Sequence, residues 1–91
     1  MKKSACIQLY GIVQGVGMRY HVFTKASRLG LTGYVKNMSD GSVKIEAEGE
    51  EADILSLVDY VKNGVCWARV EHVEIKWDDF KDSYKRFEIL G

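Results

Sequence analysis

The hydrophobic period of the chain changes once within the first thirty residues, and this change constrains the fold more than any other feature. Residues 4 to 10 alternate apolar and polar side chains, which is typical of a β-strand. From about residue 19 to residue 29 the apolar side chains recur at helical spacing. Between them, residues 11 to 18 form a turn that contains three glycines, Gly11, Gly15 and Gly17. The sequence therefore predicts a strand that leads through a flexible turn directly into a helix.

The rest of the chain continues with alternating elements. We expect strands at about 31–37, 42–48, 68–77 and 85–90, and a second helix at about 50–62. Gly30 and Gly64 follow the two helices, as glycine commonly does at helix C-termini. In the second helix the expected buried side chains are Ile54, Leu55, Val58 and Val61.

Val70 does not share the alternation of Val73, Ile75 and Trp77. The strand at 68–77 therefore either begins later or contains a bulge.

This order of elements, β-α-β-β-α-β with a short final strand, predicts an α+β fold. It is typical of a ferredoxin-like α/β sandwich, in which two helices cover one face of a mostly antiparallel sheet. Many unrelated functions use that layout, so the fold alone does not predict an activity.

Length and charge exclude several classes of protein. The 91 residues predict a single domain, 1–91, and their 46% apolar content suffices for one core. The net charge is zero, from 13 basic and 13 acidic residues, which argues against nucleic-acid and membrane partners. No apolar run approaches the roughly 20 residues of a membrane helix, and the first residues lack a signal-peptide pattern. We therefore expect a cytoplasmic protein.

The two cysteines, Cys6 and Cys66, are expected to be reduced thiols in that compartment. Their spacing is not typical of a metal site, and no metal is predicted. The sequence leaves a disulfide between them open.

The glycine-rich turn has the parts of a phosphate site. A strand-to-helix turn leaves backbone N–H groups unpaired at the start of the helix, and the helix dipole adds positive potential there. Glycines let the backbone close around a ligand, and the guanidinium of Arg19 suits phosphate oxygens. The spacing matches neither the P-loop nor the dinucleotide-binding pattern. Such turns are also common without a ligand, so these features alone leave a purely structural turn open.

Two longer motifs resemble the signatures of the acylphosphatase family. The first is residues 9–19, LYGIVQGVGMR, and the second is GYVKN at 33–37, followed by GSV at 41–43 and Gly49. Met18 stands where the family more often has phenylalanine, an apolar exchange that should keep the shape of the turn. The resemblance covers essentially the whole chain but is loose over residues 63–85.

The resemblance implies an enzyme that hydrolyses the carboxyl-phosphate bond of acyl phosphates without a cofactor or metal. It implies that Arg19 and the backbone N–H groups of the loop bind the phosphate group, which would make Gln14, Gly15, Val16, Gly17 and Met18 phosphate-binding residues. It also implies that Asn37 holds the attacking water, so that Arg19 and Asn37 are the catalytic residues. Phosphate or sulfate would bind as a product-like ligand. We expect a monomer, and the physiological acyl phosphate stays open.

Two rival functions remain at this point. One is a binding module for RNA or a small anion, against which the balanced charge counts. The other is an acylphosphatase-like domain of a larger carbamoyl-transfer protein, such as stands at the start of hydrogenase-maturation proteins. The lack of zinc-finger cysteines favours a free-standing enzyme.

Overall fold

Five strands and two helices make up the computed structural model, which describes all 91 residues. In chain order they are β1 (Lys2–Ile12), α1 (Met18–Arg28), β2 (Thr32–Asn37), β3 (Val43–Glu50), α2 (Glu51–Asn63), β4 (Arg69–Asp79) and β5 (Phe87–Leu90). Each expected element is present, with ends that differ by a few residues. Neither helix is long and apolar enough to cross a membrane.

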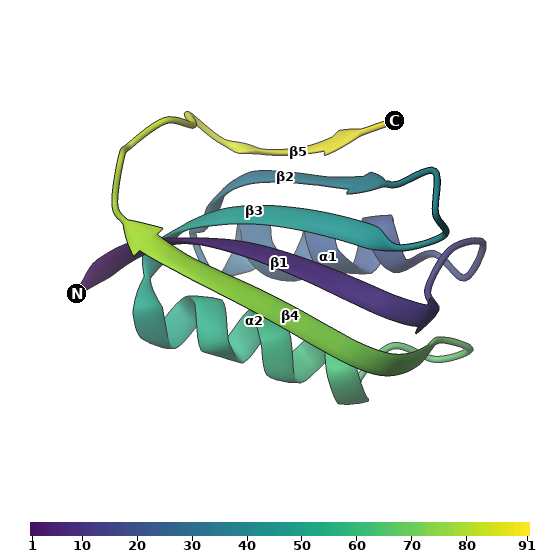
Figure 1. Ribbon diagram of the computed structural model, residues 1–91. Helices are drawn as coiled ribbons and strands as arrows, with labels where there is room; N and C mark the ends of the chain where they lie inside the picture. Colours follow the sequence, from purple (N-terminus) through teal and green to yellow (C-terminus); the bar gives the residue numbers. More distant parts are fainter.

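The five strands form one sheet in the order β4-β1-β3-β2-β5, and both helices lie on the same face of it (Figure 1). β1 pairs antiparallel with β3 and β4, and β2 pairs antiparallel with β3. Only β5 runs parallel to its neighbour, β2. The predicted ferredoxin-like sandwich is confirmed, and β5 makes the sheet mixed rather than purely antiparallel.

The irregular position of Val70 is explained by a bulge in β4. Tyr10 of β1 lies opposite His72, whereas the next residue, Gly11, lies opposite Val70. Glu71 is therefore an extra residue on β4, which shifts the alternation of the side chains before it.

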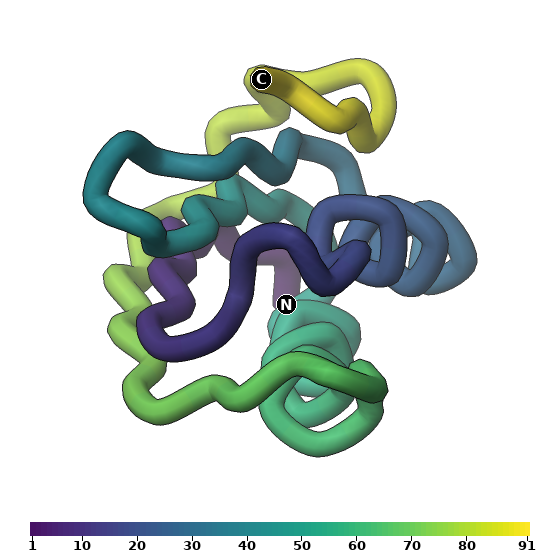
Figure 2. Tube along the Cα trace, turned by 90° about the vertical axis from the view of Figure 1, so that its right-hand side faces the viewer, coloured from purple at the N-terminus to yellow at the C-terminus, as the bar shows by residue number.

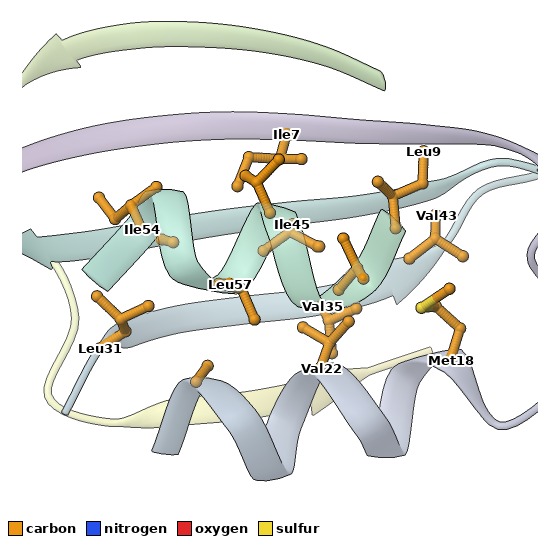
Figure 3. Close-up of a cluster of buried hydrophobic side chains, with 14 of the residues drawn as sticks. Ile7, Leu9, Met18, Val22, Leu31, Val35, Val43, Ile45, Ile54 and Leu57 are labelled. Atoms are coloured by element: carbon orange, nitrogen blue, oxygen red, sulfur yellow. The ribbon is translucent and has the colours of Figure 1, made fainter. Parts of the chain in front are cut away.

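The core lies between the sheet and the two helices (Figure 3). Ile7, Leu9, Val35, Val43 and Ile45 point from the strands toward the helices and are fully buried. Their partners on α1 are Met18, Val22 and Ala26, and on α2 Ile54, Leu57, Val58 and Val61.

One position of the predicted core was wrong. Leu55 is 47% exposed, and Leu57 takes the buried place. The helical stripe passes through Ile54, Leu57, Val58 and Val61, and Leu55 lies outside it.

A crossover, residues 80–86, carries the chain from one edge of the sheet to the other. It leaves β4 at one edge, passes β1, β3 and β2, and enters β5 at the opposite edge (Figure 1). β5 then continues toward the end of the sheet at which β1 leads into α1 (Figure 1). The crossover thereby brings the last residues of the chain to the glycine-rich turn.

Both cysteines are free. Cys6 is half-buried on β1, and Cys66 is exposed in the loop between α2 and β4. Burial and a hydrogen bond with Glu46 raise the pKa of Cys6 to about 11, so it is a protonated thiol at neutral pH.

Candidate active site

The loop between β1 and α1, the end of β2 and the end of β5 meet at one end of the sheet, which faces the viewer in Figure 2. Here a cavity of about 270 Å³ opens to the surface. The residues that line it are Val13, Gly15, Gly17, Met18, Arg19, Tyr20, Asn37 and Ile89. The first and second sequence motifs thus reach the same cavity, although they lie on different elements.

The loop presents a row of backbone donors. The amides of residues 14 to 20 make no hydrogen bond within the chain, and the first amide of α1 to bond is that of His21, to the carbonyl of Gly17 at 3.1 Å. No side chain caps α1, and its first turn has no acidic residue. Unpaired amides at a helix start, with the positive end of the helix dipole, favour an anion.

Gly17 gives the loop its conformation. Its φ of 79° lies in the left-handed region, and Gly15 has a φ of 74°. Residues with a Cβ pay a steric cost in this region, whereas glycine does not. Gly17 is the N-cap of α1, so its conformation sets the direction in which the first amides of the helix point.

Arg19 lies in the first turn of α1 and is half-buried. Its Nη1 donates a hydrogen bond to the carbonyl oxygen of Gly91, the residue after β5. This bond uses one of the five N–H donors of the guanidinium and leaves the others for a ligand in the cavity. The end of the chain therefore fixes the orientation of the only cationic side chain that lines the cavity.

Asn37 is the last residue of β2 and lies opposite Val43 of β3. It lines the cavity, and its side-chain amide makes no hydrogen bond within the chain. A neutral carboxamide can both accept and donate a hydrogen bond, so it can orient a water molecule without carrying a charge.

Gln14 and Val16 do not line the cavity, unlike the other predicted site residues. The side chain of Gln14 instead turns to the β2–β3 turn, where Nε2 donates to the carbonyls of Met38 at 2.8 Å and Ser42 at 2.9 Å. Gln14 thus ties the loop that precedes Arg19 to the turn that follows Asn37.

The turn itself is held by Asp40. Its carboxylate accepts hydrogen bonds from the Oγ of Ser42 at 2.5 Å and from the amide of Ser42 at 2.9 Å. The Oγ bond, followed by the amide bond, lowers the pKa of Asp40 below its usual value. Asp40 is therefore ionised at neutral pH and keeps the turn closed.

The sequence analysis did not single out Val13 and Ile89 as lining residues, and Tyr20, the neighbour of Arg19, also lines the cavity. Ile89 lies on β5, about 70 residues from the glycine-rich turn, and no local pattern in the sequence connects the two. Tyr10, which directly precedes the glycine-rich turn, does not line the cavity, and its hydroxyl donates to Glu74 of β4 at 3.3 Å. His21 does not line the cavity either, and its Nδ1 lies 3.0 Å from the hydroxyl of Tyr60 on α2.

Comparison with known proteins gives one consistent relationship. The family model described as Acylphosphatase matches residues 5–89. An acylphosphatase of Caldanaerobacter subterraneus subsp. tengcongensis is 49% identical over 89 residues, which cover 98% of this chain and 99% of the relative.

Solved structures agree with the sequence comparison. The crystal structure of acylphosphatase from Bacillus subtilis superposes with a TM-score of 0.93 at 38% identity and full coverage of both chains. The structure of full-length HypF in its phosphate- and nucleotide-bound form has a TM-score of 0.91 at 35% identity. The superposed region covers all of this chain but only 12% of HypF.

A match that extends over nearly the whole chain, in both sequence and structure, indicates membership of the same family and not only a shared fold. The chain belongs to the acylphosphatase family, whose members hydrolyse acyl phosphates, and it is a hydrolase of that kind.

Proposed function

We propose that the cavity beside Arg19 and Asn37 is where this chain hydrolyses acyl phosphates. The observation that carries the proposal is that a row of unpaired amides, one guanidinium and one free carboxamide line or border one cavity. The amides of residues 14 to 18 and Arg19 bind the phosphate group, and Asn37 positions the water that attacks phosphorus. In this reaction the P–O bond to the acyl group breaks and the products are a carboxylate and inorganic phosphate.

The nature of the leaving group explains why hydrolysis needs so few catalytic side chains. The departing carboxylate has a conjugate acid with a pKa of roughly 4 to 5, like that of Asp or Glu, so it leaves without a proton. Hydrolysis then depends on positioning and charge stabilisation rather than on a protein acid or a metal ion. In this mechanism an oxygen of the substrate's own phosphate group takes the proton of the attacking water.

A direct test follows the hydrolysis of benzoyl phosphate by its ultraviolet absorbance. We expect the purified protein to release benzoate and phosphate in equal amounts, with phosphate as a competitive inhibitor and with no change on adding EDTA. A phosphate monoester such as p-nitrophenyl phosphate should react far more slowly, because its leaving group is poorer. Phosphate binding without hydrolysis of benzoyl phosphate would instead favour a binding module.

The side chain of Gln14 provides a second prediction. Gln14→Met keeps the backbone amide and the approximate volume but removes both hydrogen bonds to the β2–β3 turn. We expect kcat to fall by about fivefold, which corresponds to the ~1 kcal/mol typical of a hydrogen bond, because Asn37 loses its fixed position relative to the loop. The inhibition constant for phosphate should change little.

The matched control is Gln8→Met. Gln8 of β1 donates to the Oγ of Ser42 at 3.0 Å and so reaches the same turn without contacting the phosphate loop. Both variants should lower the free energy of unfolding, but only Gln14→Met should lower kcat. If Gln14→Met keeps the same kcat as Gln8→Met, the hydrogen bonds of Gln14 contribute to stability alone.

The wider setting of this reaction is also part of the proposal. We expect the protein to act as a monomer in the cytoplasm on a small-molecule substrate, with no resident cofactor or metal. Gel filtration with light scattering tests the first point, and a mass near 10.3 kDa is the expected result.

A further inference from the structure

Only two polar residues of the chain are buried, Ser42 in the β2–β3 turn and Glu48 on β3, and Glu48 is the single charged one. Its side chain is only 3% exposed. Val43, Ile45 and Ala47 of β3 face the helices, so the alternation along the strand directs Glu48 to the opposite face. A buried carboxylate is costly unless it is hydrogen-bonded, so the partners of Glu48 indicate what it does.

Those partners belong to the crossover and to β1. One carboxylate oxygen of Glu48 accepts from the amide of Ser83 at 2.8 Å, and the other from the amide of Lys81 at 3.2 Å and the hydroxyl of Ser4 at 2.5 Å. Burial raises the pKa of Glu48, but these hydrogen bonds outweigh it and hold the pKa below its usual value. Glu48 is therefore a charged acceptor that joins residues 81–83 to the middle of the sheet.

Two other contacts show the path of the crossover. Near its start, the Nζ of Lys2 on β1 lies 5.3 Å from the ring centre of Phe80. Near its end, Tyr84 packs edge-on against Tyr34 of β2, with ring centres 5.9 Å apart. The contacts follow the order of the strands, β1, β3 and β2, and Glu48 supplies the central one.

The chain beyond the crossover leads directly to the candidate active site. The carbonyl of Arg86 accepts from the amide of Gly33, after which β5 pairs with β2 from Phe87 to Leu90. Ile89 of β5 lines the cavity, and the carbonyl of Gly91 accepts the hydrogen bond from Arg19. β5 pairs with the sheet along one edge only and packs against α1, and the crossover sets where the strand begins.

We propose that Glu48 is a positioning residue for phosphate binding, which acts by holding the crossover so that β5 and Gly91 orient the Arg19 guanidinium. The proposal rests on the phosphate-binding role of Arg19 given above. Glu48 does not line the cavity, so it contributes nothing to the ligand directly.

The test compares Glu48→Gln with Glu46→Gln. Glu46 lies two residues away on the same face of β3 and lines the same groove under the crossover, but it makes no hydrogen bond to the crossover. In Glu48→Gln we expect KM for benzoyl phosphate and the inhibition constant for phosphate to rise together by about 3- to 10-fold, a size within the range of indirect coupling, with kcat changed less than twofold. Glu46→Gln should match the wild type. Unchanged phosphate binding in Glu48→Gln would overturn the proposal.

A double substitution separates positioning from general damage. In the Arg19→Ala background, Glu48→Gln should have no further effect on phosphate binding, because the guanidinium that it orients is gone. An effect as large as in the wild-type background would show that Glu48 acts by another route and would overturn the proposal.

Hydrogen exchange gives a readout that needs no substrate. The amides of residues 81–90 should exchange faster in Glu48→Gln, whereas those of β1 and β3 should not. If Glu48→Gln does not fold, Glu48→Asp serves in its place, since it keeps the charge but shortens the side chain, and a smaller increase in exchange of the same amides is expected.

A wild-type protein that neither hydrolyses benzoyl phosphate nor binds phosphate refutes the proposed function. An active wild type whose β5 exchange is unaltered by either Glu48 substitution refutes only this inference.

Discussion

Arg19→Ala is expected to lower kcat/KM for benzoyl phosphate by on the order of 100- to 1000-fold, the loss typical of removing one preorganised donor in an active site. The guanidinium is the only cationic side chain that lines the cavity, and Gly91 holds it in place. Most of the loss should be in phosphate binding, so the inhibition constant for phosphate should rise with KM. Steady-state kinetics with phosphate as inhibitor gives both values.

Two further variants make the Arg19 result specific. Arg19→Lys keeps the charge but not the planar fork of donors, and we expect it to recover only part of the lost affinity. Arg28→Ala removes an exposed arginine from the last turn of the same helix, and it should behave like the wild type. Normal inhibition by phosphate in Arg19→Ala would show that the backbone amides bind the ligand without the guanidinium.

Asn37→Ala is expected to lower kcat by on the order of 100-fold, again the scale of one well-placed polar group in an active site. The loss should fall on turnover alone, because the role proposed for the side chain is to position water and not to bind phosphate. The inhibition constant for phosphate should therefore stay close to that of the wild type. This division is the opposite of the one expected for Arg19→Ala, so the two variants check each other.

The matched control for Asn37→Ala is Asn63→Ala. Asn63 ends α2, is exposed, and donates only to the carbonyl and the carboxylate of Asp59. It should leave both kinetic constants unchanged. A loss of phosphate affinity in Asn37→Ala, without a comparable loss of turnover, would mean that its role has been misassigned.

Much of the fold could be predicted because the sequence encodes it locally. The alternation of β1 and β3, the helical stripes and the glycines after each helix depend on neighbouring residues, so the order of elements and the layout of the sandwich followed from them. The break in the alternation around Val70 indicated either a bulge or a later start of the strand, and the structure has the bulge, at Glu71. Leu55 was misplaced because both Leu55 and Leu57 fit an approximate helical spacing, and only contact with the sheet distinguishes them.

The candidate site could be predicted only where it lies within the two motifs. The placement of Arg19 and Asn37 at one cavity is consistent with the roles that the family resemblance implies, while those roles stay predictions until they are measured. The parts that β5 supplies could not be predicted, since the contact of Gly91 with Arg19 spans 72 residues of chain. The turning of the Gln14 side chain toward the β2–β3 turn depends on the same kind of long-range packing.

The unpaired amides of residues 14 to 20 have a consequence for mutational scanning. Substituting alanine along this loop alters side chains and leaves every N–H group in place, so a conventional scan reports side-chain and conformational effects, such as the steric cost at Gly15 and Gly17, but not the loss of a backbone donor. Only proline, or an ester in place of the amide, removes such a donor. A survey of this protein that relies on side-chain replacement would therefore assign to Arg19 alone the phosphate binding that we propose it shares with the backbone amides.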